Sequence, residues 1–425
     1  MAAEFWGELH PSWQIIGTRE GDLAGYCIVL GVTGGAAIYK SIDLARLLMR
    51  FGAKVRVVMT KEATRLVSPT LFEWATGMPA ITELSGMIEH VALAEHCDAM
   101  VIAPATLDTM AEIASCRAST PVSATAQEFA GRGKRVLLVP AMHAGMWVRA
   151  KSVVAKLEEQ GFYVMRPLLE EERAKYPSVD HVAWWVETVA TRGQDLKDQK
   201  VVVTAGATRE YIDPVRIITN PSSGLMGVSL ALEALWRGAE VLLVHGHVSV
   251  NVPRLEGLKR KFAETSSDMA EALAKAMERF KPSMAFYAAA VADYRPKKTS
   301  STKIPTEQGE LVLRLEPTPK VIPAAMAARP EALHVGFAAE TVSSDEELLS
   351  KARLKLEKYK LDMVAANNIS EEGVGFAAET NRLLVVSWRG KVWSIPRMHK
   401  RRAARRLIDI SVRMLRRGEL RSRST

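Results

Sequence analysis

Cysteine is scarce in this chain, and long apolar runs are missing. Cys27, Cys97 and Cys116 are too few for a disulfide framework and lack the Cys/His spacing of a structural metal site. We expect Cys97 and Cys116 to be small helix or loop residues rather than nucleophiles. No apolar run approaches the roughly 18 residues that cross a membrane. The first residues lack the basic segment of a signal peptide. These absences predict a soluble cytoplasmic protein.

A general excess of positive charge is also missing. The net charge is +9, and the residues from Arg397 to Thr425 account for all of it, with eleven Lys or Arg and two acids. Because the rest of the chain is neutral, the sequence argues against a protein that coats nucleic acid along its length. We expect Ile395 to Gly418 to form a helix that covers a sheet with its apolar stripe and turns its arginines outward.

Short β-rich apolar runs alternate with helical segments along the whole chain. Such alternation predicts βαβ units and parallel sheets covered on both faces. In the first half the expected strands are 26–33, 54–60, 99–105, 135–141 and 162–167. In the second half they are 200–206, 240–246, 284–290, 334–339 and 362–368, followed by a hairpin that turns at Arg389 and Gly390. The predicted fold class is α/β, with two doubly wound, Rossmann-like parallel-sheet domains in tandem.

A polar stretch with one glycine, from Thr191 to Gln199, is the best candidate for a linker. It sets the expected domains at 1–192 and 193–425. In open parallel sheets, ligands bind beyond the carboxyl ends of the strands, at helix N-termini. The segments directly after each strand are therefore the places to look for a site.

In the first half, small residues and hydroxyls follow several strands. Glycines let the backbone approach a phosphate closely, and the start of a helix supplies N–H donors. A wall of Met142 and His143 on a neighbouring strand end suits a flat, phosphorylated cofactor. The candidate cofactor-binding residues are Gly34, Gly35, Thr60, Pro104, Ala105, Thr106 and Met142.

The segments GVTGGAAIYK, IEHVALAEHCDAMVIAPAT and PAMHAGMW resemble the flavin-containing cysteine decarboxylases. Within these, they look most like the phosphopantothenoylcysteine decarboxylase half of the bifunctional coenzyme A biosynthesis proteins. The resemblance covers roughly residues 25 to 165 and implies that the candidates above hold FMN. It also implies that His90 is catalytic. FMN would oxidise the cysteinyl side chain, which then loses CO2, and would afterwards return the hydride.

Departures from this family leave two interpretations open. His143 stands where the family has an asparagine, and residues 166–180 lack the cysteine with which bacterial members protonate their product. Asp108 and Ser119 replace an asparagine and an aspartate of other family motifs. An archaeal branch shares the histidine, which makes His143 a candidate catalytic proton donor in an archaeal-like variant. The alternative is a flavin-binding half that has lost decarboxylation.

In the second half, one run leaves a strand at Thr204, passes Arg216 and Asn220, and opens a helix at SSGLMG (222–227). Serines and glycines at a helix start suit phosphate, and Arg216 and Asn220 could reach a carboxylate or phosphate. The spacing is not GxGxxG, and no acid ends the next strand at the ribose-reading position. This argues against an NAD dehydrogenase.

This run, with AAVADYRP, GFAAET and AANN, resembles phosphopantothenate–cysteine ligase over about residues 198 to 412. The implied reaction consumes CTP with Mg2+ through an acyl-cytidylate, from which the amine of cysteine displaces CMP. By resemblance, Arg216 and Asn220 handle the acyl-cytidylate and Lys303 is catalytic in the second step. Leu225 stands where the family has a lysine, and the metal ligands are unknown. The implied nucleotide-binding residues are Ser222, Ser223, Gly224, Asp293, Lys303, Phe337 and Lys355.

The combined expectation is a bifunctional enzyme of coenzyme A biosynthesis that acts on small molecules. The resemblance also implies a homo-oligomer, because decarboxylase halves form trimers and ligase halves form dimers, which together close as a dodecamer. No membrane or nucleic-acid partner is expected. The alternatives are a ligase with a degenerate flavin-binding half, and a nucleic-acid-associated flavoprotein that uses the basic C-terminal helix. Preference for CTP over ATP depends on base contacts and stays open.

Overall fold

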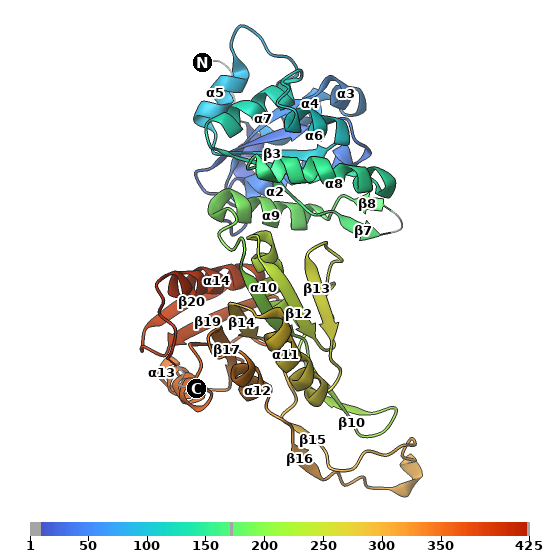
Figure 1. The fold of residues 1–425 in the computed structure, drawn as a ribbon, viewed down its shortest axis with the longest axis vertical. Coiled ribbons are helices and arrows are strands. Elements are labelled where there is room, and N and C mark those ends of the chain that lie inside the picture. Colours follow the sequence, from blue (N-terminus) through green and yellow to red (C-terminus); the bar gives the residue numbers. More distant parts are fainter. Residues whose placement is uncertain (1–9, 171–172, 423–425) are drawn as a thin grey trace. The chain divides into compact units, whose positions relative to one another are not determined.

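The computed structural model describes residues 10–170 and 173–422. The chain forms two compact units, each with its own main sheet (Figure 1). The first unit comprises Met1–Asp195 with Pro253–Glu256, and the second comprises Leu196–Val252 with Gly257–Thr425. Among the described residues, none of the helices combines the length and apolar character that crossing a membrane requires.

The main sheet of the first unit has five parallel strands in the order β2-β1-β3-β4-β6. The expected strands are confirmed, and the order reverses between β1 and β3, which is where such sheets bind ligands. Every residue of β3 is buried, so both faces of the sheet are covered, as an unbroken apolar run predicts. The strands are β1 (Cys27–Val32), β2 (Lys54–Met59), β3 (Ala99–Ala105), β4 (Arg135–Pro140) and β6 (Tyr163–Val164).

Two groups of helices cover this sheet. Helix α2 contacts α4 and α9, whereas α5 contacts α7, and α6 contacts α7 and α8. Their bounds are α2 (Lys40–Arg50), α3 (Lys61–Leu66), α4 (Pro69–Thr76), α5 (Glu89–His96), α6 (Leu107–Ala114), α7 (Pro121–Gly131), α8 (Ala144–Glu159) and α9 (Val179–Arg192), with 3-10 turns η1 (Pro11–Ile15) and η2 (Ala36–Tyr39).

A small antiparallel sheet joins residues 140–147, which follow β4, to residues 166–180. Strand β5 (Met142–His143) pairs with β8 (Arg173–Lys175), which pairs with β7 (Leu168–Glu170). The sequence did not predict these strands, because each of them is too short to show alternation. Residues 171 and 172 of this stretch lie outside the described residues.

Three cysteines are too few for a disulfide framework, but two of them form one disulfide, which the sequence did not predict. Cys27 at the start of β1 is bonded to Cys97 at the end of α5, with their Cα atoms 4.5 Å apart. The two cysteines lie 70 residues apart in the chain, and parallel pairing of β1 with β3 brings their segments together. Cys116 is free and exposed.

The main sheet of the second unit has eight strands in the order β13-β12-β9-β14-β17-β18-β19-β20. The predicted parallel strands and the C-terminal hairpin are confirmed. The sequence did not predict strand β13, because most residues of this edge strand are exposed and several are charged, so that it has no apolar run. The strands are β9 (Lys200–Ala205), β12 (Glu240–His245), β13 (Leu258–Phe262), β14 (Met284–Tyr287), β17 (Leu333–Glu340), β18 (Met363–Asn368), β19 (Thr380–Ser387) and β20 (Val392–His399).

Two short hairpin-like pairs form an arm next to this sheet (Figure 1). The pairs are β10 (Arg209–Tyr211) with β11 (Ile217–Thr219), and β15 (Tyr294–Pro296) with β16 (Leu315–Pro317). The helices of the second unit are α10 (Leu225–Trp236), α11 (Ser266–Phe280), α12 (Val321–Ala328), α13 (Asp345–Lys358) and α14 (Lys400–Arg416), with the 3-10 turn η3 (Thr306–Gln308).

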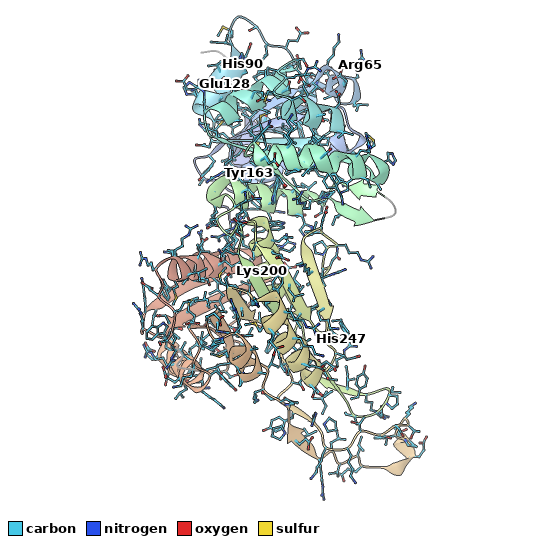
Figure 2. All side chains as sticks on the ribbon, viewed as in Figure 1. Arg65, His90, Glu128, Tyr163, Lys200 and His247 are labelled. Atoms are coloured by element: carbon cyan, nitrogen blue, oxygen red, sulfur yellow. A yellow bond between two sulfur atoms is a disulfide. The ribbon has the colours of Figure 1, made fainter. Side chains whose placement is uncertain are left out.

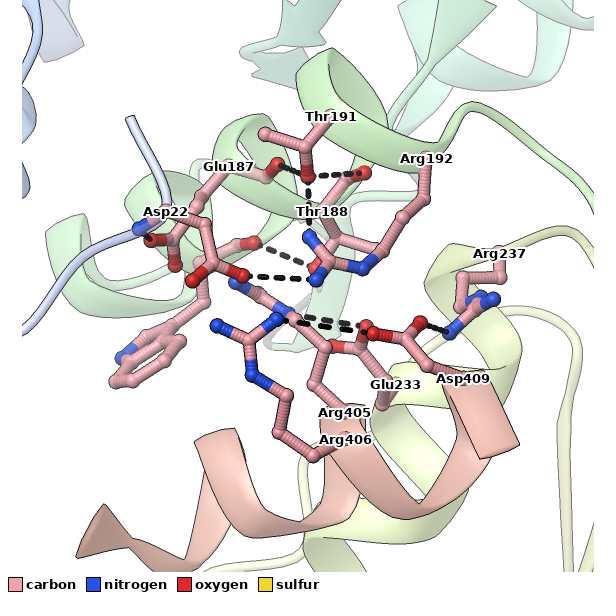
Figure 3. Close-up of polar contacts among 11 residues, drawn as sticks. Asp22, Glu187, Thr188, Thr191, Arg192, Glu233, Arg237, Arg405, Arg406 and Asp409 are labelled. Atoms are coloured by element: carbon pink, nitrogen blue, oxygen red, sulfur yellow. Dashed lines mark hydrogen bonds and ion pairs between the residues drawn. The ribbon is translucent and has the colours of Figure 1, made fainter. Parts of the chain in front are cut away.

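Helix α14 corrects two expectations about the basic tail. It begins at Lys400 rather than at Ile395, because β20 extends to His399. Its arginines do not all face outward: Arg405 is 1% exposed and forms an ion pair of 3.1 Å with Glu233 of α10 (Figure 3). Arg237 likewise pairs with Asp409 at 2.7 Å. Part of the local excess of charge therefore balances carboxylates of the packed helices.

Candidate functional site

In the first unit, the ends of adjacent strands are joined by side-chain hydrogen bonds. Thr33, directly after β1, donates from Oγ1 to the carbonyl of Pro104 at 2.7 Å and accepts from the N–H of Thr106 at 3.2 Å. Thr106 then caps α6 by accepting from the N–H of Thr109. The two predicted cofactor-binding segments after β1 and β3 therefore form one surface with a helix N-terminus beside it.

Gly34 and Thr60 extend this surface to the end of β2. A side chain on Gly34 would place its Cβ only 2.6 Å from the Cβ of Glu62, so the turn after β1 requires glycine to pack on the start of α3. Thr60 caps α3 and donates its N–H to the carbonyl of Val32 at 3.0 Å. Gly35 lies against Pro104, 3.4 Å from where its Cβ would be.

Met142 and His143 follow β4 at the same edge. The N–H of Ala141 donates to the carbonyl of Ala105 at 3.3 Å, which places this segment beside the end of β3. His143 is exposed at the N-cap of α8, where no side-chain cap bond restrains it. Trp147 is 3% exposed and packs in the core, with an indole N–H that has no partner among the described residues.

His90 is the second residue of α5, a helix that packs on α7 (Figure 2). Its Nδ1 atom is buried and has no hydrogen-bond partner within residues 10–170 and 173–422. Among the described residues, no hydrogen bond links His90 to the surface formed by Thr33, Pro104 and Thr106. The neighbouring Glu89 accepts from the hydroxyl and from the N–H of Ser85, and these two hydrogen bonds lower its pKa.

In the second unit, a cavity of about 310 Å3 opens at the carboxyl end of the main sheet. It brings together segments that are far apart in the sequence. Five of the predicted nucleotide-binding residues line it, and so does Asn220. The five are Ser222, Gly224, Asp293, Phe337 and Lys355. The residues that line the cavity include Thr204, Asn220, Ser222, Gly224, Asp293, Lys320, Phe337, Lys355, Gly375, Phe376 and Lys400.

Helix α10 presents its N-terminus to this cavity. Gly224 has φ +77°, and a Cβ there would lie 2.4 Å from Cγ1 of Val248, so only glycine fits before the helix. Ser222 accepts from the N–H of Gly224 at 3.3 Å. Ser223 does not line the cavity; its hydroxyl donates to the carbonyl of Phe376 at 3.1 Å.

The neighbouring polar side chains of the cavity are tied to the backbone of the strand ends. Asn220 donates from Nδ2 to the carbonyls of Ala290 and Val291, each at 3.3 Å. Within the part of the chain that the structure describes, its Oδ1 accepts no hydrogen bond and can therefore accept one from a ligand. Thr204 accepts from the N–H of Ala289 at 3.0 Å.

Charged residues also meet at the cavity. Lys355 donates to the carbonyl of Phe337, and burial lowers the pKa of this lysine despite the carboxylates of Glu340 and Asp293 nearby. Lys320 pairs with Asp293 at 2.6 Å, which raises the pKa of Lys320. Sequence reasoning missed Lys320 because it follows a short turn rather than a predicted strand.

Arg216 and Lys303 are not brought to this cavity. They lie on the arm, where Arg216 donates to Asp213 and to the carbonyl of Ile304 at 3.1 Å. Lys303 is exposed directly before Ile304. The arm therefore places these two proposed catalytic residues next to each other, apart from Asn220, Asp293 and Phe337.

The described residues contain no cluster of three or more His, Cys, Asp or Glu side chains arranged to hold a metal ion. Asp293 supplies a carboxylate to the cavity. A divalent ion here would be held mainly by a phosphorylated ligand, which is how Mg2+ usually binds in nucleotide sites.

Both units thus have the form of α/β domains with a phosphate-compatible surface at the carboxyl ends of parallel strands. Residues 16–191 match the family described as "Flavoprotein", and residues 196–414 match the "DNA/pantothenate metabolism flavoprotein C-terminal domain". The chain belongs to the family of coenzyme A biosynthesis bifunctional proteins, whose members carry both domains.

Three relatives in this family come from archaea and bacteria, and each is called "Coenzyme A biosynthesis bifunctional protein CoaBC". The protein of Thermococcus kodakarensis is 40% identical over 96% of this chain and 100% of its own length. That of Vibrio vulnificus is 35% identical over 85% of this chain and 91% of its own. That of Methanocaldococcus jannaschii is 32% identical over 86% and 89%.

The arm gives a prediction about pH. Burial alone would raise the pKa of Asp213, but the N–H groups of Val215, Ile304 and Arg216 and the Arg216 guanidinium donate to it, which lowers the pKa to about 2. Because this pKa lies below its ordinary value of 3.8, the stabilisation is complete above about pH 4 and is lost as the pH falls toward 2.

We therefore expect Asp213→Asn to speed amide hydrogen exchange at Val215, Arg216 and Ile304 by at least about tenfold at pH 7. In the unmodified chain, the same amides should lose protection only below about pH 4. Glu316→Gln is the control, because it removes a partly exposed ion pair of the same arm with Arg295. Unchanged exchange in Asp213→Asn would contradict this account of how the arm is held.

Proposed function

We propose that this chain catalyses two successive steps of coenzyme A biosynthesis. It joins 4′-phosphopantothenate to cysteine with CTP, and then decarboxylates phosphopantothenoylcysteine to 4′-phosphopantetheine with FMN. We assign the decarboxylase to residues 1–192 and the ligase to 193–425. The proposal depends most on the cavity of the second unit, which gathers Asn220, Asp293 and Phe337 from three separate segments. We place the reaction in the cytoplasm, because its phosphorylated substrates do not cross membranes freely.

The ligase reaction needs negative charge to be held in place while one anion displaces another. The carboxylate of 4′-phosphopantothenate attacks the α-phosphorus of CTP, and pyrophosphate leaves. The amine of cysteine then attacks the acyl carbon, and CMP leaves. The N-terminus of α10 and the ammonium groups of Lys320 and Lys355 suit the phosphates, and the face of Phe337 suits the base. Asp293, together with the phosphates of the nucleotide, would hold Mg2+, which would neutralise part of their negative charge.

Arg216 and Lys303 fit this reaction if the arm reaches the cavity of a second copy of the chain. The arm carries Val215 and Val312, which are 64% and 75% exposed, as a surface that another subunit could cover. We therefore propose a homo-oligomer in which ligase halves pair as dimers. Trimeric decarboxylase halves would complete a dodecamer.

The first unit fits FMN on two observations. The turn at Gly34 and the caps at Thr60 and Thr106 offer backbone N–H groups and helix N-termini at one edge of the sheet. His90 keeps a buried nitrogen with no partner among the described residues, as a group awaiting a ligand would. FMN, when bound, supplies the oxidation that labilises the carboxylate and the hydride that is returned. His90 would orient the substrate, and His143, exposed at the α8 N-cap, would deliver the proton.

The ligase assignment predicts specific products. The complete chain with 4′-phosphopantothenate, cysteine, CTP and Mg2+ should release CMP and pyrophosphate together with phosphopantothenoylcysteine, measured by mass spectrometry. Asn220→Ala should slow amide formation about hundredfold, because the side-chain Oδ1 of Asn220 can no longer accept a hydrogen bond from the attacking amine of cysteine. Asn251→Ala, which replaces an exposed asparagine of the same unit, is the matched control. Absence of CMP among the products would refute the ligase assignment. Turnover with ATP but not with CTP would show that ATP is the nucleotide substrate.

The decarboxylase assignment is tested separately. His90→Asn should retain bound FMN, seen by its visible absorbance, but should release CO2 from phosphopantothenoylcysteine at least about hundredfold more slowly. His96→Asn, an exposed histidine on the same helix, should behave like the unmodified chain. Equal CO2 release by His143→Asn, His143→Ala and the unmodified chain would rule out His143 as proton donor. FMN without CO2 release in the unmodified chain would instead favour the ligase with a degenerate flavin-binding half.

A further inference from the structure

Lys400 is a buried lysine at the edge of the second unit's cavity. It is the first residue of α14, is 3% exposed and lines the cavity that holds Asn220 and Lys355. Its Nζ donates to the carbonyl of Gly375 at 2.7 Å and to that of Phe376 at 3.2 Å. Two carbonyls satisfy two of the three ammonium protons and leave one donor for a ligand.

This position is unfavourable for a lysine in the absence of a ligand. Within the described residues, no carboxylate lies within 4.0 Å of its Nζ, and burial lowers the pKa of Lys400 to about 8. A cation at the first residue of a helix is also opposed by the helix dipole. A buried cation without a nearby anion lowers the free energy of unfolding. A bound anion would therefore stabilise this part of the fold.

A second contact connects Lys400 with the N-terminus of α10. The carbonyl of Phe376 accepts both from Lys400 and from the hydroxyl of Ser223, at 3.1 Å. Ser223 directly precedes Gly224, the N-cap of α10. Leu225 follows and brings no charge. The ammonium group of Lys400 and the backbone N–H groups of α10 therefore approach the cavity from two elements joined by one carbonyl, an arrangement that suits one phosphate.

The other charged groups of the cavity are committed differently. Asp293 is paired with Lys320, and Lys355 donates to the carbonyl of Phe337 on the neighbouring strand β17. The positive charge of Lys400 thus belongs to the side of the cavity where α10 begins.

We propose that Lys400 binds a phosphate oxygen of the nucleotide triphosphate, and of the pyrophosphate that leaves, in the cavity of the second unit. This assignment rests on the proposed ligase function for the identity of the nucleotide. It takes Lys400 out of the basic tail and makes it a binding residue.

The test compares Lys400→Met, Lys400→Arg and the exposed control Lys358→Met in the complete chain. Affinities for CTP and for inorganic pyrophosphate are measured by calorimetry, and thermal stability is measured without ligand. Lys400→Met should weaken both ligands by about tenfold to hundredfold, while its melting temperature without ligand stays equal or rises. Lys400→Arg should recover part of the affinity, and Lys358→Met should match the unmodified chain.

A purely structural role for Lys400 predicts the opposite pattern. Lys400→Met would then melt at a lower temperature and bind CTP and pyrophosphate as before, and this outcome would overturn the proposal. The two levels of inference can be separated. Binding of pyrophosphate that depends on Lys400, without CMP formation from CTP, would refute the ligase assignment alone. Normal ligase turnover with unchanged affinities in Lys400→Met would refute the role of Lys400 alone.

Discussion

Each unit is organised by parallel pairing of strands whose two faces are both buried. Parallel strands all end at the same edge, and the backbone groups freed there must find new partners. In the first unit they find Thr33 and Thr106, which cross-link two strand ends. In the second unit Thr204 and Asn220 do the same for the segments after β9 and β14. The same constraint that satisfies the backbone thus builds a polar surface beside a helix N-terminus in both units.

Charge is distributed in the second unit according to what burial allows. Arg405 is buried and meets a carboxylate of α10, so its charge is balanced within the packed helices. Lys400, five residues earlier on the same helix, is buried and meets only carbonyls. The contrast separates two roles within one basic segment: Arg405 holds α14 on α10, whereas the charge of Lys400 faces a cavity. The buried, paired Arg405 cannot contact nucleic acid, which weakens the alternative of a nucleic-acid-binding arm.

Sequence alone predicted the strands that are buried on both faces, because continuous apolar runs between helices leave little choice. It also predicted the segments that follow them. The family resemblance, rather than the strand pattern, implied Asn220, Asp293 and Phe337, and these three line one cavity. It did not predict β13, whose charged residues read as a loop, or the short pairs of the arm. Nor did it predict the Cys27–Cys97 bond, since only the β1–β3 pairing brings those residues together. Lys400 was hidden because a count of charges does not distinguish a buried lysine from a solvated one.

In the proposed complex, the phosphates of a nucleotide lie between the N-terminus of α10 and Lys400. A crystal structure of the complete chain with CTP and Mg2+ measures this directly. The account predicts a phosphate oxygen within about 3 Å of the Nζ of Lys400, with the base near Phe337. Clear density for CTP with its triphosphate on another side of the cavity, or outside it, would contradict the account.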